Sequence, residues 1–195
     1  RLLDVLRKEL LPTPSKPHYV WTSLTALSRV FQGLFKAVRP SESAPITARF
    51  VVAVWEHECA RVMRDKLVDE TDCAFFDETV RRLMPDLLVD PEVDKSPELF
   101  MVSFKHNTDI SAQPLYEPGG TLAEIRDRVT TFLRKYNEEN PRQKMDLVLF
   151  EDAIRHLLSI NRLMEIPRSS GLLVGVGGSG KRSLTLLSAY ISGAA

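Results

Sequence analysis

The sequence predicts an α/β fold that is mostly helical, in which a helical region precedes the opening strand and helix of a P-loop nucleotide-binding domain. Apolar residues recur at helical spacing through most of the chain before residue 165, whereas strand-sized apolar runs are few and short. Near the end of the chain, a glycine-rich loop from Gly175 to Lys181 lies between a short apolar run and another stretch with helical spacing.

Composition and charge limit the class of protein. The chain has 195 residues, 44% hydrophobic and 27% charged, which is enough for one or two globular units. Its 26 basic and 26 acidic side chains balance, and no apolar run approaches the length of a membrane span. Two isolated cysteines, Cys59 and Cys73, are too few for a disulfide framework and suit a reducing cytoplasm. We therefore expect neither nucleic acid nor a membrane among its partners.

The first part of the chain predicts amphipathic helices. A short amphipathic segment at residues 1–7 precedes a proline-rich connector at residues 11–18, which cannot continue a helix. A longer helix follows, with Thr22 or Ser23 as its expected N-cap and Pro40 as its stop. The apolar stripe of that helix consists of Leu24, Leu27, Phe31, Leu34, Phe35 and Val38.

Two further helices are expected, one from Val51 to Leu67 and a shorter one from Asp77 to Met84. The shorter helix has acidic residues at its start and basic residues near its end, the favourable order for the helix dipole. The trio His57-Glu58-Cys59 is interpreted as packing with a polar edge, because adjacent helical residues diverge in direction and no partner motif follows at ligand spacing.

The middle of the chain predicts a domain boundary. Residues 85–97 are acidic and interrupted by proline, and a strand-sized apolar run follows at residues 99–104. Residues 106–120 contain two prolines and two adjacent glycines. We place the boundary within this stretch, which divides the chain into residues 1–111 and 112–195.

The second part predicts two helices before the glycine-rich loop. Thr121-Leu-Ala-Glu124 is a capping box that opens an amphipathic helix ending at Asn140-Pro141. A short apolar run at Leu147–Phe150 leads into another helix, which ends before Pro167. The apolar positions of that helix are Ile154, Leu157, Leu158 and Met164.

The glycine-rich loop matches the phosphate-binding pattern G-x-x-x-x-G-K. Leu172–Val174 is expected to be a buried strand before it, and the spacing of Leu184, Leu187 and Ile191 predicts a helix after it. Glycine permits the positive φ that turns amides toward an anion, while the helix N-terminus and a lysine add positive charge. The residues expected to bind ATP or ADP are Gly175, Val176, Gly177, Gly178, Ser179, Gly180, Lys181, Arg182 and Ser183.

Arg182 departs from this motif, because Ser or Thr normally follows the lysine and presents a hydroxyl to magnesium. Ser183, one residue later, is the remaining candidate for Mg²⁺, but it is rotated by about 100° along a helix. The sequence therefore predicts nucleotide binding more directly than hydrolysis. Because a P-loop domain also needs later strands and a carboxylate that orients magnesium, we expect the chain to be a piece of a longer protein.

Two blocks of the sequence resemble axonemal dynein heavy chains, and together they cover nearly the whole chain. One block is similar to the entry to the fourth AAA+ module and comprises Met145–Ile154, Ile160–Arg162, Pro167–Arg168 and Leu172–Lys181. The other block is similar to the closing helical lid of the third module and comprises Leu11–Pro14, His18–Tyr19, Leu27–Gly33 and Trp55–Glu58.

The resemblance implies that residues 1–111 are the C-terminal lid part of the third module and residues 112–195 the start of the fourth, with its Walker A loop. It further implies an ATP-driven, minus-end-directed microtubule motor of the axoneme in cilia and flagella. Its expected partners are neighbouring AAA+ modules, microtubules, and dynein intermediate and light chains. The site would hold ATP or ADP in a regulatory or structural role, and this segment by itself is not expected to be catalytic.

One position departs from the family pattern. Members usually have Leu-Arg-Asp-Leu-Ser-Arg where this chain has Leu24–Arg29, so Thr25 replaces the arginine expected to sense phosphate in the third module. Arg29 is then the remaining candidate sensor, although a solvated or ion-paired helix residue is its simpler interpretation.

Two alternative functions of the chain also stay open. It could be a separate P-loop ATPase or kinase, which needs an acidic metal site after the loop, or a scaffold that binds no nucleotide.

Overall fold

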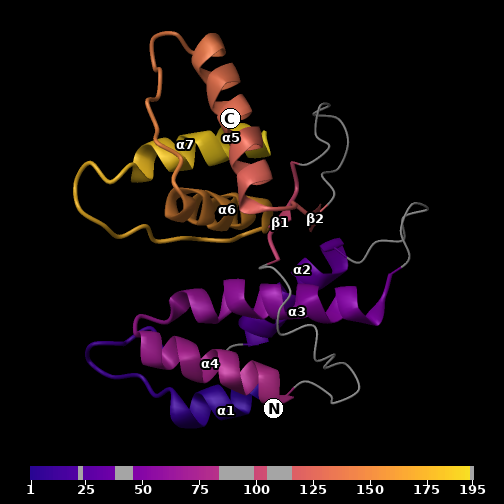
Figure 1. The fold of residues 1–195 in the computed structure, drawn as a ribbon. Helices are drawn as coiled ribbons and strands as arrows, with labels where there is room; N and C mark the ends of the chain where they lie inside the picture. The colour runs from indigo at the N-terminus through magenta and orange to yellow at the C-terminus, as the bar shows by residue number, and fades with distance from the viewer. Residues whose placement is uncertain (22–23, 38–45, 84–98, 105–115, 194–195) are drawn as a thin grey trace. The chain divides into compact units, whose positions relative to one another are not determined.

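Two separate hydrophobic cores organise the chain in a computed structural model that describes residues 1–21, 24–37, 46–83, 99–104 and 116–193 (Figure 1). They belong to two units, Arg1–Leu99 and Phe100–Ala195. The boundary predicted between residues 111 and 112 lies outside the described residues, as do the predicted cap residues Thr22 and Ser23 and the predicted stop at Pro40.

The described part of the first unit is entirely helical apart from its connecting segments. Its elements are α1 (Leu2–Glu9), α2 (Leu24–Ala37), α3 (Ala48–Val62), the 3-10 helix η1 (Arg64–Lys66) and α4 (Glu70–Leu83). Helix α1 packs on α4, and α2 packs on α3. The core residues are Leu6, Leu10, Tyr19, Trp21, Val30, Cys59, Val62, Met63, Phe76 and Val80.

Helix α4 begins seven residues earlier than the sequence pattern predicts, at Glu70 instead of Asp77. Glu70 and Asp72 place negative charge in its first turn, where the positive end of the helix dipole stabilises them. The added turns carry Phe76 into the core. Burial of this side chain explains why the stretch from Glu70 to Phe76 is helical.

The apolar stripe predicted for α2 does not face the core of its unit. The buried positions of this helix are Val30, Gly33 and Ala37, whose small side chains let α2 approach α3 closely. The exposed fractions of four predicted stripe residues are 72% for Leu24, 37% for Leu27, 45% for Phe31 and 71% for Phe35. Helix α2 is therefore apolar on two faces, and spacing alone could not choose between them.

The proline-rich connector is held to the start of α4 by a polar cluster. The phenol of Tyr19 donates to Asp72 Oδ2 at 2.9 Å and accepts from the Val68 amide at 2.9 Å. The ammonium of Lys16 forms ion pairs with Asp69 and Asp72. The hydrogen bond from Lys16, and then that from Tyr19, holds the pKa of the Asp72 carboxyl below its usual value.

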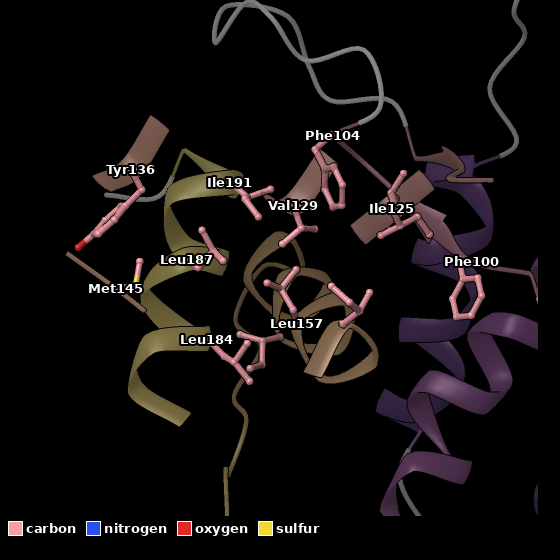
Figure 2. Close-up of a cluster of buried hydrophobic side chains, with 13 residues drawn as sticks. Phe100, Phe104, Ile125, Val129, Tyr136, Met145, Leu157, Leu184, Leu187 and Ile191 are labelled. Atoms are coloured by element: carbon pink, nitrogen blue, oxygen red, sulfur yellow. The ribbon is translucent and has the colours of Figure 1, made fainter. Parts of the chain in front are cut away.

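The second unit combines three helices with a small hairpin among its described residues. Its elements are β1 (Met101–Val102), β2 (Glu117–Pro118), α5 (Leu122–Glu139), α6 (Glu151–Glu165) and α7 (Lys181–Ser192). Strands β1 and β2 are antiparallel, with Met101 opposite Pro118, so the predicted strand at residues 99–104 is reduced to two residues. Helices α6 and α7 pack on each other and α5 packs on both, around a core that includes Ile125, Val129, Leu157 and Leu187 (Figure 2).

The predicted capping box of α5 is confirmed. The Thr121 hydroxyl accepts from the Glu124 amide at 3.3 Å, and the Glu124 carboxylate accepts from the Thr121 amide at 2.7 Å. At the other end of α5, the Asn137 carboxamide donates to Met145 O at 2.9 Å and accepts from Met145 N at 2.7 Å. Asn137 thus substitutes for a neighbouring strand and fixes the start of the extended segment at residues 145–150.

Replacing Asp72 with Asn should lower the unfolding free energy by about 1 kcal/mol at pH 7, because a charge-assisted hydrogen bond from Lys16 is lost. A carboxyl with a lowered folded-state pKa contributes stability above its ordinary pKa of 3.8, and that contribution is lost as the pH falls through the lowered value. Urea unfolding of wild type and Asp72→Asn should therefore differ at pH 7 and converge at strongly acidic pH.

The matched control is Asp127→Asn, which changes an exposed carboxylate on α5. It should leave stability nearly unchanged at both pH values. An equal loss for Asp72→Asn at neutral and acidic pH would contradict the role given to its charge.

Candidate phosphate-binding site

Two glycines give the loop between residues 175 and 181 its shape. Gly178 has a φ of 80° and Gly180 a φ of 75°, both in the left-handed region that costs other residues free energy. Gly180 is the N-cap of α7, and its carbonyl accepts from the Leu184 amide at 2.9 Å. The loop therefore ends directly at a helix N-terminus, as the motif predicts, and the dipole of that helix favours an anion there.

Lys181, the first residue of α7, closes the loop on itself. Its ammonium donates to Gly175 O at 2.8 Å, to Val176 O at 2.7 Å and to Ser179 Oγ at 2.9 Å. These three bonds use all three of its N–H donors. A Cβ at residue 175 would lie 3.2 Å from Ser179 Oγ and 3.5 Å from the ammonium, so glycine leaves room for this closure.

The apolar run before the loop differs from the prediction of a buried strand. Residues 171–176 have no regular secondary structure, and the exposed fractions are 89% for Leu172, 45% for Leu173 and 84% for Val174. A strand needs neighbours that pair with its amides and carbonyls. Among the described residues β1 pairs only with β2, so residues 172–174 lack a partner strand.

The helix after the loop confirms the predicted spacing and is anchored against α6. Leu184, Leu187 and Ile191 are buried in the core of the second unit. At the far end of α7, Asn161 Nδ2 of α6 donates to Ser192 Oγ at 2.7 Å. Packing along most of its length therefore sets the direction in which the N-terminus of α7 points.

An apolar side chain of the extended segment at residues 145–150 lies beside the loop as well. A Cβ at Gly180 would be 3.7 Å from Leu147 Cδ2, which places Leu147 next to the N-terminus of α7. Within the same segment Val148 is 79% exposed and Phe150 is 59% exposed. The glycine motif did not reveal the contact with Leu147.

Arg182 and Ser183 lie in the first turn of α7 but differ in exposure. Arg182 is exposed and Ser183 is half-buried. The first turn contains no acidic residue. No group of three or more His, Cys, Asp or Glu side chains suited to a metal ion is found within the part of the chain that the structure describes.

Arg29 lies on α2 in the first unit, so it is not part of the loop. It is half-buried, and no ion pair joins it to another described residue. The pKa of Lys66 is lowered by burial and then by the positive charge of Arg29, which shows that these two cations are near each other.

The trio His57-Glu58-Cys59 is structural. Cys59 is 1% exposed, and burial, then the charges of Glu58 and Glu56, raises the pKa of its thiol to about 12. Nδ1 of His57 donates to the carbonyl of Leu99 at 3.1 Å. Glu58 is fully buried instead of lying at a polar edge. A thiol with so high a pKa is not a nucleophile at neutral pH.

Gly178 and Gly177 provide a matched pair that tests the loop conformation. An added Cβ meets no atom within 4 Å at either position, but only Gly178 has a positive φ. Gly178→Ala should therefore lower the unfolding free energy by about 1 kcal/mol, whereas Gly177→Ala should leave it nearly unchanged. Urea unfolding of the two variants measures the difference. Equal losses of unfolding free energy would contradict the left-handed conformation of Gly178.

Comparisons with known proteins bear on both units. The family profile described as P-loop containing dynein motor region D4 matches residues 145–195, and the AAA+ lid domain profile matches residues 3–94. Dynein axonemal heavy chain 5 of Rattus norvegicus is 37% identical over 207 residues, covering 99% of this chain and 6% of the relative. The gamma chain of the flagellar outer arm dynein of Chlamydomonas reinhardtii is 37% identical over 215 residues, covering 98% of this chain and 5% of that relative.

Human dynein axonemal heavy chain 17 is 41% identical over 190 residues, which is 94% of this chain and 4% of the human protein. The chain thus spans only about one-twentieth of the length of these relatives. The first unit contains the match to the lid, the phosphate loop lies inside the match to the dynein P-loop region, and the similarity to the relatives covers nearly every residue. The chain therefore belongs to the axonemal dynein heavy chain family and consists of AAA+ lid and P-loop sequence.

Proposed function

We propose that this chain binds ATP or ADP at the loop from Gly175 to Lys181, within the AAA+ ring of an axonemal dynein heavy chain. The observation that carries the proposal is the closed loop itself, in which Lys181 bonds Gly175 O, Val176 O and Ser179 Oγ at the N-terminus of α7. The loop thus brings an ammonium, backbone amides and a helix N-terminus together in one place. A polyphosphate is the ligand that suits such a point.

On binding, Lys181 exchanges at least one of its loop acceptors for a phosphate oxygen near the β- and γ-positions. The amides of residues 176–181 and the side chains of Ser179, Arg182 and Ser183 surround the rest of the phosphate chain. Leu147 lies beside the loop, and the exposed apolar side chains of Val148 and Phe150 belong to the same extended segment, which supports a neighbouring position for the nucleoside.

We further propose the place of the two units in the motor. Residues 1–111 form the lid of the third AAA+ module, and residues 112–195 open the fourth, as the match to motor region D4 supports. The intact heavy chain is an ATP-driven, minus-end-directed microtubule motor of the axoneme in cilia and flagella. ATP hydrolysis occurs principally in the first module, so this site has a regulatory or structural role in the ring. Other partners of the intact motor are dynein intermediate and light chains.

Exposed apolar surfaces support packing against other modules of the same heavy chain. Leu172 and Val174 are more than four-fifths exposed in an extended segment, and Leu24 and Phe35 are more than two-thirds exposed on α2. Surfaces of this kind are normally covered in a folded protein. We infer that strands of the fourth module pair with residues 172–174, and that the exposed face of α2 packs on a neighbouring part of the ring.

Arg29 is the proposed phosphate sensor of the third module. It is half-buried beside Lys66 and forms no ion pair with a described residue, which supports a role in meeting an anion from outside the lid. Thr25 stands where the family has an arginine. It is exposed and has no charge with which to bind a phosphate.

Lys181→Ala should abolish nucleotide binding at this loop in the intact heavy chain, because it removes the ammonium that closes the loop and is proposed to bind the phosphates. Cryo-electron microscopy of the motor with ADP measures occupancy at this one site. The matched control is Lys135→Ala, which removes an exposed lysine from α5. Nucleotide density that persists in Lys181→Ala would refute the phosphate role, and a wild-type loop that stays empty would favour a scaffold.

Phe35→Ser should leave the stability of this isolated chain within about 0.5 kcal/mol of wild type, because the ring is 71% exposed. In the intact motor the same change should lower the melting temperature, because the ring is then buried against a neighbour. Val30→Ser, at a position that is 1% exposed, should destabilise both the isolated chain and the intact motor. The packing proposal fails if Phe35→Ser is neutral in the intact motor.

A further inference from the structure

The donor groups around the loop do not suit a magnesium ion. Magnesium takes oxygen ligands in near-octahedral geometry, and in P-loops one ligand is the hydroxyl directly after the lysine. Arg182 occupies that position with a guanidinium, which is always charged and offers no acceptor. The first turn of α7 has no acidic residue that could offset this charge.

Ser183 does not replace the missing ligand. It is half-buried in the first turn of α7, about 100° further around the helix than Arg182. The guanidinium of Arg182 adds a full positive charge to a helix terminus that already carries partial positive charge, and this added charge repels a divalent cation.

We propose that this loop takes its nucleoside polyphosphate without magnesium, and that Arg182 supplies the positive charge that the metal ion provides elsewhere. This inference rests on the proposed nucleotide binding. Arg182 is exposed, and no ion pair joins its side chain to a described residue, so it can turn toward a ligand. Its planar fork matches two phosphate oxygens in a bidentate contact, whereas Lys181 acts as a point charge.

The proposed contact makes Arg182 a specificity-determining residue. A ligand that arrives as its magnesium complex must release the ion, since guanidinium and metal compete for the same phosphate oxygens. A nucleoside diphosphate or triphosphate free of metal meets two cationic side chains and the loop amides at once. The site thus discriminates by the metal state of the polyphosphate, a property separate from recognition of the base.

The test is photolabelling of the intact heavy chain with 2-azido-ADP, quantified on peptides from this segment, in magnesium chloride and in EDTA. For wild type the half-saturating concentration in EDTA should be no higher than in magnesium chloride, because the ligand must release the ion before it binds. Arg182→Thr should raise the half-saturating concentration at least about tenfold in EDTA, because a charge-assisted bond to phosphate is lost. The same variant should make labelling depend on magnesium, because the new hydroxyl can bind the ion. Arg182→Lys should retain most of the metal-independent labelling.

Controls separate this inference from the proposed function. Arg126→Thr removes an exposed arginine from α5 and should change nothing. The inference is overturned by wild-type labelling that requires magnesium, or by unchanged labelling of Arg182→Thr in EDTA. No labelling of this segment in either condition would instead overturn nucleotide binding itself.

Discussion

The closure of the loop by the ammonium of Lys181 is the interaction on which the rest of the site depends. Three oxygens accept from one cation, and two of them are backbone carbonyls at the start of the loop. This contact joins the start of the loop to the first residue of α7. Without it, a run of glycines would have many accessible conformations and a large entropic cost of ordering.

The position of Lys181 depends in turn on the core of the second unit. Helix α7 is buried along Leu184, Leu187 and Ile191 against α6 and α5 (Figure 2). Asn161 of α6 holds the far end of α7 through Ser192. The loop has little buried surface of its own, since its residues are almost all exposed. Its geometry is therefore supported by the helix that follows it, as expected for a binding loop on a rigid scaffold.

The two units are built on the same physical pattern, a small helical core with a large apolar surface left exposed. Helix α2 buries Val30 but exposes Phe35, and the extended segment before the loop exposes Leu172 and Val174. The chain spans about one-twentieth of the length of these relatives. In the proposed place of the two units, other parts of the ring cover these exposed apolar residues.

Local signals in the sequence determined the parts of the structure that depend on a few adjacent residues. The capping box at Thr121 and Glu124, the helix through Leu184 and Leu187, and the loop from Gly175 to Lys181 all follow from short-range hydrogen bonding or helical spacing. The resemblance to dynein heavy chains, carried by two blocks of motif residues, was also present in the sequence and is confirmed by the comparisons.

Tertiary structure alone decided which apolar face is buried and which runs become strands. Periodicity could not show that Val30 and Gly33, instead of Phe31 and Phe35, face α3, because α2 is apolar on both sides. The apolar run at Leu172–Val174 has the composition of a strand, but a strand exists only where another strand pairs with it. The closure by Lys181 likewise required the packed position of α7. Helical spacing and caps are local, whereas pairing and burial depend on residues far apart in the chain.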